Sequence, residues 1–135
     1  MRLVATSYKP QAISNIENRM KNFKELKIWQ KGIEIAINCY QLTAAFPNTE
    51  KFGLANQINR AAVSIPSNIA EGSSRTSDKD YHRFSEIALG SLFELETQLS
   101  IAQNLNFGNQ DLLNKIFLLV IEEQKMLTAF MKSLK

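Results

Sequence analysis

Apolar residues recur at helical spacing in the stretch QINRAAVSIPSNIAEG, residues 57–72. Steps of three and four residues place them on one face of a helix. Pro66 lies inside this helix and removes a backbone hydrogen bond, so we expect a kink there. Asn48 or Thr49 can cap the helix at its start, and Gly-Ser-Ser at 72–74 ends it. The inner stripe consists of Ala55, Ile58, Ala62, Ile65 and Ile69.

Three further helices accompany this one. The first is expected over residues 23–46, the third begins after Ser77, which forms a capping box with Asp80, and the fourth is capped by Asn109. Because short connections make neighbouring helices antiparallel, the sequence predicts an all-α fold, an up-down-up-down antiparallel four-helix bundle with its second helix kinked at Pro66. The expected inner residues are Leu26, Trp29, Ile33, Ala36, Tyr40 and Ala44 in the first helix, Phe84, Ala88, Leu92, Leu95, Leu99 and Ala102 in the third, and Leu113, Ile116, Val120, Gln124, Leu127, Met131 and Leu134 in the fourth.

The composition fits one soluble domain. The chain has 135 residues, of which 44% are hydrophobic and 21% are charged, and a chain of this length supports a single core. The longest apolar run, residues 116–121, is far shorter than the roughly 20 residues of a membrane span, and no signal peptide is visible. The single cysteine, Cys39, cannot form an intramolecular disulfide. We therefore expect a cytoplasmic protein without membrane contact.

The net charge of +3 is concentrated at the start of the chain. Residues 1–22 hold four basic side chains against Glu17, whereas the remainder has equal numbers of acidic and basic residues. Because residues 1–22 also lack helical periodicity, we divide the chain into an N-terminal arm or extension, residues 1–22, and a four-helix bundle, residues 23–135. The arm is either a disordered tail or a segment held against the bundle.

No pattern in the sequence indicates catalysis. Di-iron bundles use a Glu-x-x-His pair on each of two helices, but the single histidine, His82, has Lys79 at that spacing. Cys39 has no histidine on a matching face to form a nucleophilic pair. Residues 71–74 lack the spaced glycines and the lysine of a phosphate-binding loop. We therefore predict neither enzymatic activity, nor a metal ion, nor a cofactor.

The first helix has more apolar surface than an isolated bundle needs. With Ile33 at the centre of the inner stripe and about 100° per residue, a second apolar stripe falls on the opposite side. The third helix repeats this feature more weakly. An irregularly wrapped core, with the arm over the first helix, would explain the second stripe; we favour a subunit interface, because large apolar patches are rare on monomers. The expected interface residues are Ile28, Ile35, Cys39, Leu42, Phe46, Gly90, Phe93 and Ile101.

Four blocks of the sequence resemble one bacterial family. They read FKELKIWQ at 23–30, FPNTEKFGL at 46–54, the stretch at 57–72 quoted above, and FSEIALGSLFELETQL at 84–99. Together they are similar to the four-helix bundle proteins encoded in intervening sequences of bacterial 23S ribosomal RNA genes. That family is in turn similar to the accessory variability determinants of diversity-generating retroelements.

The resemblance implies a ring-like homopentamer without known enzymatic activity. For the retroelement relatives it also implies that a basic surface binds nucleic acid and a reverse transcriptase. We interpret the matching motif residues as structural, because Pro66 frees a carbonyl that neighbouring polar side chains can satisfy. These residues are Arg60, Ser64, Pro66, Asn68, Glu71 and Gly72.

Two functions remain open at this point. The chain is either a homo-oligomeric accessory protein that binds RNA or DNA, or a protein–protein scaffold that docks one partner and touches no nucleic acid. The outer stripe of the second helix is polar and serves either as a solvated face or as a binding strip; it consists of Arg60, Ser64, Ser67 and Glu71. The candidate phosphate contacts are Lys24, Lys27, Lys31, Arg60, Arg75 and Arg83.

Overall fold

The structure, a computed structural model, describes residues 22–135 and is all-α over that range, with no strand. The predicted arm lies outside the described residues, apart from Asn22. Two short 3-10 turns, η1 (Phe23–Glu25) and η2 (Asn48–Glu50), accompany four α-helices. The helices are α2 (Lys27–Thr43), α3 (Leu54–Ser73), α4 (Asp78–Asn104) and α5 (Gln110–Ser133).

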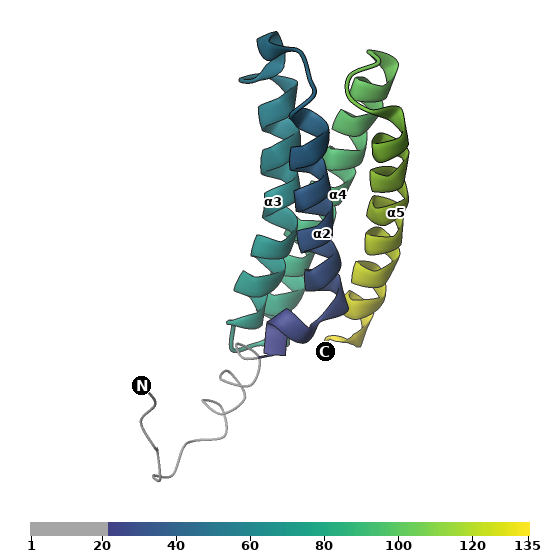
Figure 1. Ribbon diagram of the computed structural model, residues 1–135. Helices are drawn as coiled ribbons and strands as arrows, with labels where there is room; N and C mark the ends of the chain where they lie inside the picture. Colours follow the sequence, from purple (N-terminus) through teal and green to yellow (C-terminus); the bar gives the residue numbers. More distant parts are fainter. Residues whose placement is uncertain (1–21) are drawn as a thin grey trace, which may run out of the picture.

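The four α-helices lie side by side around one apolar core (Figure 1). Each helix packs against two others, α2 and α4 both contacting α3 and α5, and the α3–α4 contact is the most extensive. The α2–α3 and α4–α5 connections lie at one end of the molecule in Figure 1. The α3–α4 turn, η1 and the carboxyl terminus lie at the other end, which we call the η1 end.

The inner stripes predicted for α3 and α4 are confirmed, because every one of their residues is buried. In α5, Leu113, Ile116, Val120 and Leu127 are buried as expected. Gln124, by contrast, is only half-buried, and its neighbour on the chain faces the core in its place. That neighbour is a carboxylic acid, Glu123.

The cap residues predicted for α4 and α5 are confirmed. Ser77 caps α4, and its hydroxyl oxygen accepts a hydrogen bond from the Asp80 backbone N–H at 3.1 Å. Asn109 caps α5 in the same way, with the Leu112 N–H as donor at 2.9 Å. Gly108 has a φ of 80°, a backbone conformation that favours glycine, and this lets the α4–α5 turn close over the end of α2.

The start of α3 differs from the prediction. Asn48 and Thr49 do not cap this helix, because they lie in η2, where the Glu50 N–H donates to the Pro47 carbonyl at 2.9 Å. The helix begins at Leu54, whose N–H donates to Oε1 of Glu50 at 3.2 Å. The carboxylate of Glu50 therefore satisfies a free N–H of the first turn, the place where a negative charge is also favoured.

The first long helix is shorter than predicted at both ends. It begins at Lys27, because Leu26 has extended backbone (ψ 128°) that separates η1 from α2. From this position Leu26 packs against the core. The helix ends at Thr43, before the expected end at Phe46.

The two apolar stripes of α2 are exchanged relative to the prediction. The residues at 28–46 that were assigned to a subunit interface lie in the core of the protomer, and none of these five is more than 7% exposed. Conversely, the stripe expected inside lies at the edge of the core or outside it. Tyr40 is 55% exposed, Ala44 is exposed and Ile33 is half-buried, while Trp29 and Ala36 are half-buried and pack against the edge of the core. The interface assignment is therefore wrong for Ile28, Ile35, Cys39, Leu42 and Phe46.

Gly32 explains which stripe is inside. It lies on the same helical face as Ile28 and Ile35 and is buried. A Cβ at Gly32 would lie 3.2 Å from Cβ and 3.3 Å from the backbone nitrogen of Pro66. The backbone of α2 thus approaches α3 closely at the Pro66 ring, because Gly32 has no side chain to hold the two helices apart. Only the face that carries Gly32 permits this approach.

We predict that Gly32→Val destabilises the protein by about 1–3 kcal/mol, because the added side chain has to push α2 away from the rigid ring of Pro66. Urea unfolding followed by far-ultraviolet circular dichroism measures the change. Gly90→Val is the matched control: Gly90 is also helical, nothing lies within 4 Å of a Cβ there, and the expected change is below about 0.5 kcal/mol. Equal effects of the two substitutions would contradict a tight α2–α3 contact.

Candidate nucleic-acid interface

Two of the predicted basic residues converge on one aromatic ring at the η1 end. The guanidinium carbons of Arg75 and Arg83 lie 4.5 Å and 5.0 Å from the ring centroid of Phe84, a distance at which cation–π attraction operates. Glu71 pairs with Arg75 at 3.3 Å, and Asp80 lies 4.0 Å from Arg83. Arg75 of the α3–α4 turn and Arg83 of α4 thus lie against the same ring, each with an acidic neighbour.

Gly72 makes this turn possible. A Cβ at Gly72 would lie 2.9 Å from Cβ of Phe84 and 2.9 Å from Cδ1 of Tyr81. The end of α3 thus rests directly on the first turns of α4, and a side chain at Gly72 would force the two apart. Because Gly72 has no side chain, Phe84 can pack directly against the end of α3, where its ring contacts both arginines.

The lysines of η1 and α2 lie at the same end but in different surroundings. Lys24 lies over the ring of Phe23 at 6.0 Å and is exposed, as is Lys27. Lys31 is paired with Glu122 of α5, and its side chain is only 16% exposed. Its charge is therefore largely engaged inside the protomer, which makes Lys31 a poorer phosphate contact than its two neighbours.

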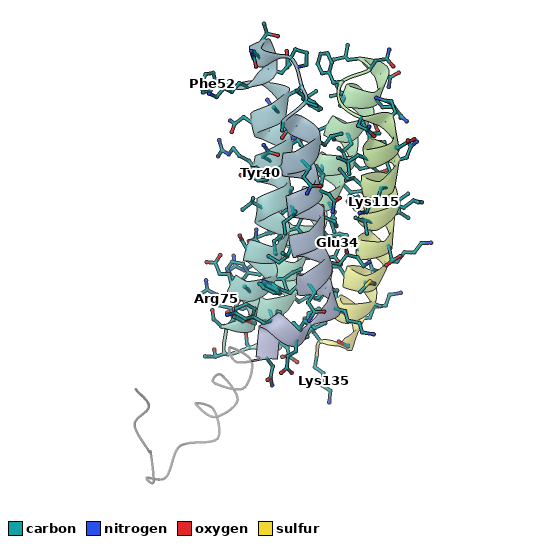
Figure 2. All side chains as sticks on the ribbon, viewed as in Figure 1. Glu34, Tyr40, Phe52, Arg75, Lys115 and Lys135 are labelled. Carbon is teal, nitrogen blue, oxygen red and sulfur yellow. The ribbon has the colours of Figure 1, made fainter. Side chains whose placement is uncertain are left out.

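Arg60 does not join the cluster. It is exposed on α3, 13 residues before the last residue of that helix, or roughly 20 Å along the axis at 1.5 Å per residue. The basic residues predicted from sequence thus fall into an η1-end group and one distant arginine. Figure 2 shows Arg75 and Lys135 at the η1 end.

Sequence reasoning missed two lysines of this end. Lys79 and Lys135 line a groove of about 550 Å³ together with Arg83, His82 and Asp80. The backbone N–H of Lys135 donates to Oδ2 of Asp78 at 3.2 Å, which brings the carboxyl terminus to the start of α4. A terminal lysine gives no sequence signal for this, because only the antiparallel packing of α5 on α4 places it there.

The remaining motif residues act within the helices. The Ser64 hydroxyl donates to the Ala61 carbonyl at 2.8 Å and lies 2.5 Å from the hydroxyl of Ser91 on α4. The Asn68 amide donates to the Ser64 carbonyl at 2.8 Å. Pro66 frees the carbonyl of Ala62, so these bonds do not go to the carbonyl that we expected them to satisfy. The bonds to Ala61 and Ser64 stay within α3, and the Ser64–Ser91 contact ties α3 to α4.

Two titratable groups are fully buried in the core. Burial raises the pKa of the Cys39 thiol to about 12, which makes this cysteine a packing residue and a poor nucleophile. Glu123 is 0% exposed, and neither of its carboxyl oxygens has a hydrogen-bond partner among the described protein atoms. Burial raises the pKa of Glu123 to about 8, with Lys31 lowering it and Glu122 raising it. Sequence reasoning missed Glu123 because Gln124 beside it fitted the inner stripe equally well.

Residues 22–135 contain no group of three or more histidine, cysteine or acidic side chains that could hold a metal ion. None of the helices described is long and apolar enough to cross a membrane.

Comparisons with known proteins agree with the resemblance of the sequence blocks. Residues 24–129 match the sequence profile of the family described as 23S rRNA-intervening sequence protein. A similar solved structure is a protein of unknown function from the S23 ribosomal protein family of Bacteroides thetaiotaomicron VPI-5482. It is 26% identical, superimposes with a TM-score of 0.72, and the match covers 78% of this chain and 96% of that one. A search of curated proteins gave no match.

We predict that the free energy of unfolding falls as the pH rises from about 4.5 to about 8. The folded state holds the Glu123 proton more tightly than the unfolded state, so stability is lost over this window by up to about 1.4 kcal/mol per pH unit and levels off above it. Urea titrations at several pH values measure the slope. Glu123→Gln is expected to flatten it, whereas Glu94→Gln, on an exposed position of α4, leaves it unchanged. A slope that survives Glu123→Gln would assign it to other groups.

Proposed function

The chain belongs to the 23S rRNA-intervening sequence protein family, and on this premise we propose that it is a non-catalytic, homo-oligomeric accessory protein of the cytoplasm that binds nucleic acid. The observation that carries the proposal is the pair Arg75 and Arg83 on the ring of Phe84. Guanidinium groups bind phosphate in a two-pronged geometry, and groups already fixed in position lose less entropy on binding.

The point at which the described chain begins supports the same surface. The described chain starts at the η1 end, beside Lys24 and Lys27 (Figure 1). The arm that joins there carries the whole net charge of the chain, +3. The bundle, residues 23–135, has no net charge of its own. We infer that the basic residues of the arm add to the phosphate contacts of the η1 end.

Homo-oligomerisation is supported by the apolar residues that α2 presents outward. Ile37 and Tyr40 are each 55% exposed, and Ile33 lies on the same face. On α4, Phe93 and Ile101 are 54% and 46% exposed. Contact between the α2 set of one copy and the α4 set of the next, repeated head-to-tail, is an arrangement that closes rings. A pentamer is the ring that the family resemblance implies.

We also propose an up-down-up-down order of the four helices and a kink of α3 at Pro66. The positions of the connections at alternating ends in Figure 1 support an up-down-up-down order of the helices. The missing N–H of Pro66 inside α3 supports a kink at that residue.

The second candidate function is a protein–protein scaffold. The outward apolar stripe of α2 favours it, because such a surface suits a protein partner better than a phosphate backbone. A reverse transcriptase is the partner class that the family resemblance implies.

We predict that Ile37→Glu yields monomers with normal helicity, because it places a charge in a desolvated interface without disturbing the core. Size exclusion coupled to light scattering gives the mass, and circular dichroism gives the helicity. Ile35→Glu is the contrasting variant: Ile35 is 0% exposed, so this change is expected to unfold the protomer. An unmodified protein that is monomeric at micromolar concentration would rule out the oligomer.

We predict that a structured RNA or a DNA duplex binds weakly, with little sequence preference, and with an affinity that falls steeply as salt rises. Filter binding between roughly 50 and 200 mM salt measures the slope. Arg75→Gln combined with Arg83→Gln should weaken binding and reduce the slope, while Arg60→Gln, which changes an exposed arginine outside the η1 end, should have little effect.

Deleting residues 1–19 separates the contribution of the arm, because it removes three of the four basic side chains of residues 1–22. Loss of binding in this variant alone would assign binding to the arm. If the intact protein retains no RNA or DNA in a salt-sensitive manner at low ionic strength, the scaffold becomes the better account.

A further inference from the structure

The contact between α2 and α5 contains a buried carboxyl group. We call this contact the α2–α5 seam; it is less extensive than the contacts that α3 makes with α2 and α4. Glu122 of α5 is paired with Lys31 of α2, and the next residue, Glu123, points into the core, where its two oxygens have no hydrogen-bond partner among the described atoms. A polar group buried in this way weakens packing unless something satisfies it.

The charges that act on Glu123 come from α2 and α5. From α2 the cation is Lys31, and from α5 the like charge is Glu122. On the α4 side, Glu96 accepts a hydrogen bond from Gln124 of α5 at 2.7 Å. Cys39, also buried on α2, keeps its proton, because burial raises its pKa to about 12. An ionised Glu123 therefore has one nearby cation, Lys31, which is already paired with Glu122.

Solvent approaches the seam from outside. A groove of about 550 Å³ lies over it, lined by Lys27, Gln30, Lys31, Glu34, Glu122 and Met126. Lys31 thus lies between the groove and the core, with its side chain 16% exposed. It is paired with the exposed Glu122, and its charge also acts on the buried Glu123, so the two carboxyl groups share one cation.

We propose that Glu123 is a protonation-dependent latch for α5: the neutral acid lets α5 close on α2, and the ionised acid draws Lys31 away from Glu122 and loosens α5 from the other three helices. The proton leaves to solvent through the groove over the seam. Buried apolar residues of α5, such as Val120 and Leu127, then become accessible. The device operates within one protomer and goes beyond the proposed function, since it requires neither nucleic acid nor a second copy.

Amide hydrogen exchange of the full chain, corrected for the intrinsic effect of pH, tests the latch. At pH 7.5 the amides of α5 are expected to be at least tenfold less protected than those of α3. Their protection should rise by up to about tenfold for each pH unit as the pH is lowered to 5.5. In Glu123→Gln, α5 should be better protected at pH 7.5 and its protection should no longer depend on pH.

Glu122→Gln provides a second variant that keeps Glu123 in place. It frees Lys31 for Glu123, so the pH dependence of α5 protection is expected to shrink, whereas Glu94→Gln on the exposed face of α4 should not change it. Equal protection of α5 and α3 at pH 7.5 would overturn the proposal, because opening would then be global. A pH dependence of α5 that persists in Glu123→Gln, or one that Glu122→Gln leaves unchanged, would overturn it too.

Discussion

The close approach of α2 and α3 at Gly32 and Pro66 is the constraint on which the rest of the molecule depends. It sets the rotation of α2 about its own axis, because only the face without a side chain at this level fits against the proline ring. That rotation places Ile35 and Leu42 in the core and leaves Ile37 and Tyr40 outside. It also points Lys31 toward α5, where it meets Glu122. One missing Cβ thus determines the core, the outward apolar surface and the ion pair of the α2–α5 seam.

Most of the fold could be predicted from the sequence, because in three of the helices one apolar stripe is clearly the stronger. In α3 the opposite face is polar and in α4 the second apolar stripe is weak, so periodicity identifies the core, and the caps at Ser77 and Asn109 mark where α4 and α5 begin. In α2 both faces are apolar, and periodicity gives no preference between them. The signal that resolves the choice is Gly32, but its partner Pro66 lies 34 positions further along the chain. Such a contact becomes visible only when the two helices are placed together.

The candidate site was predictable in its chemistry but not in its arrangement. Arg75 and Arg83 stand out as basic residues, yet nothing in their spacing shows that both rest on Phe84, because Gly72 has to bring the end of α3 onto α4 first. Lys31 and Arg60 look equivalent to them in sequence; one is engaged by Glu122, and the other lies far along α3. Glu123 escaped prediction for a different reason. A carboxylic acid in an apolar stripe violates the pattern on which the prediction rests.

The stacking of two arginines on Phe84 has an evolutionary consequence. Lysine would preserve the charge at positions 75 and 83, but an ammonium group neither lies flat on a ring nor presents paired N–H groups to a phosphate. Related chains that keep the phenylalanine are therefore expected to keep arginine beside it, whereas chains that lose the ring have no physical reason to prefer arginine over lysine. Substitutions at positions 75, 83 and 84 are therefore expected to occur together in related chains, whereas the exposed lysines of η1 and α2 are expected to vary independently.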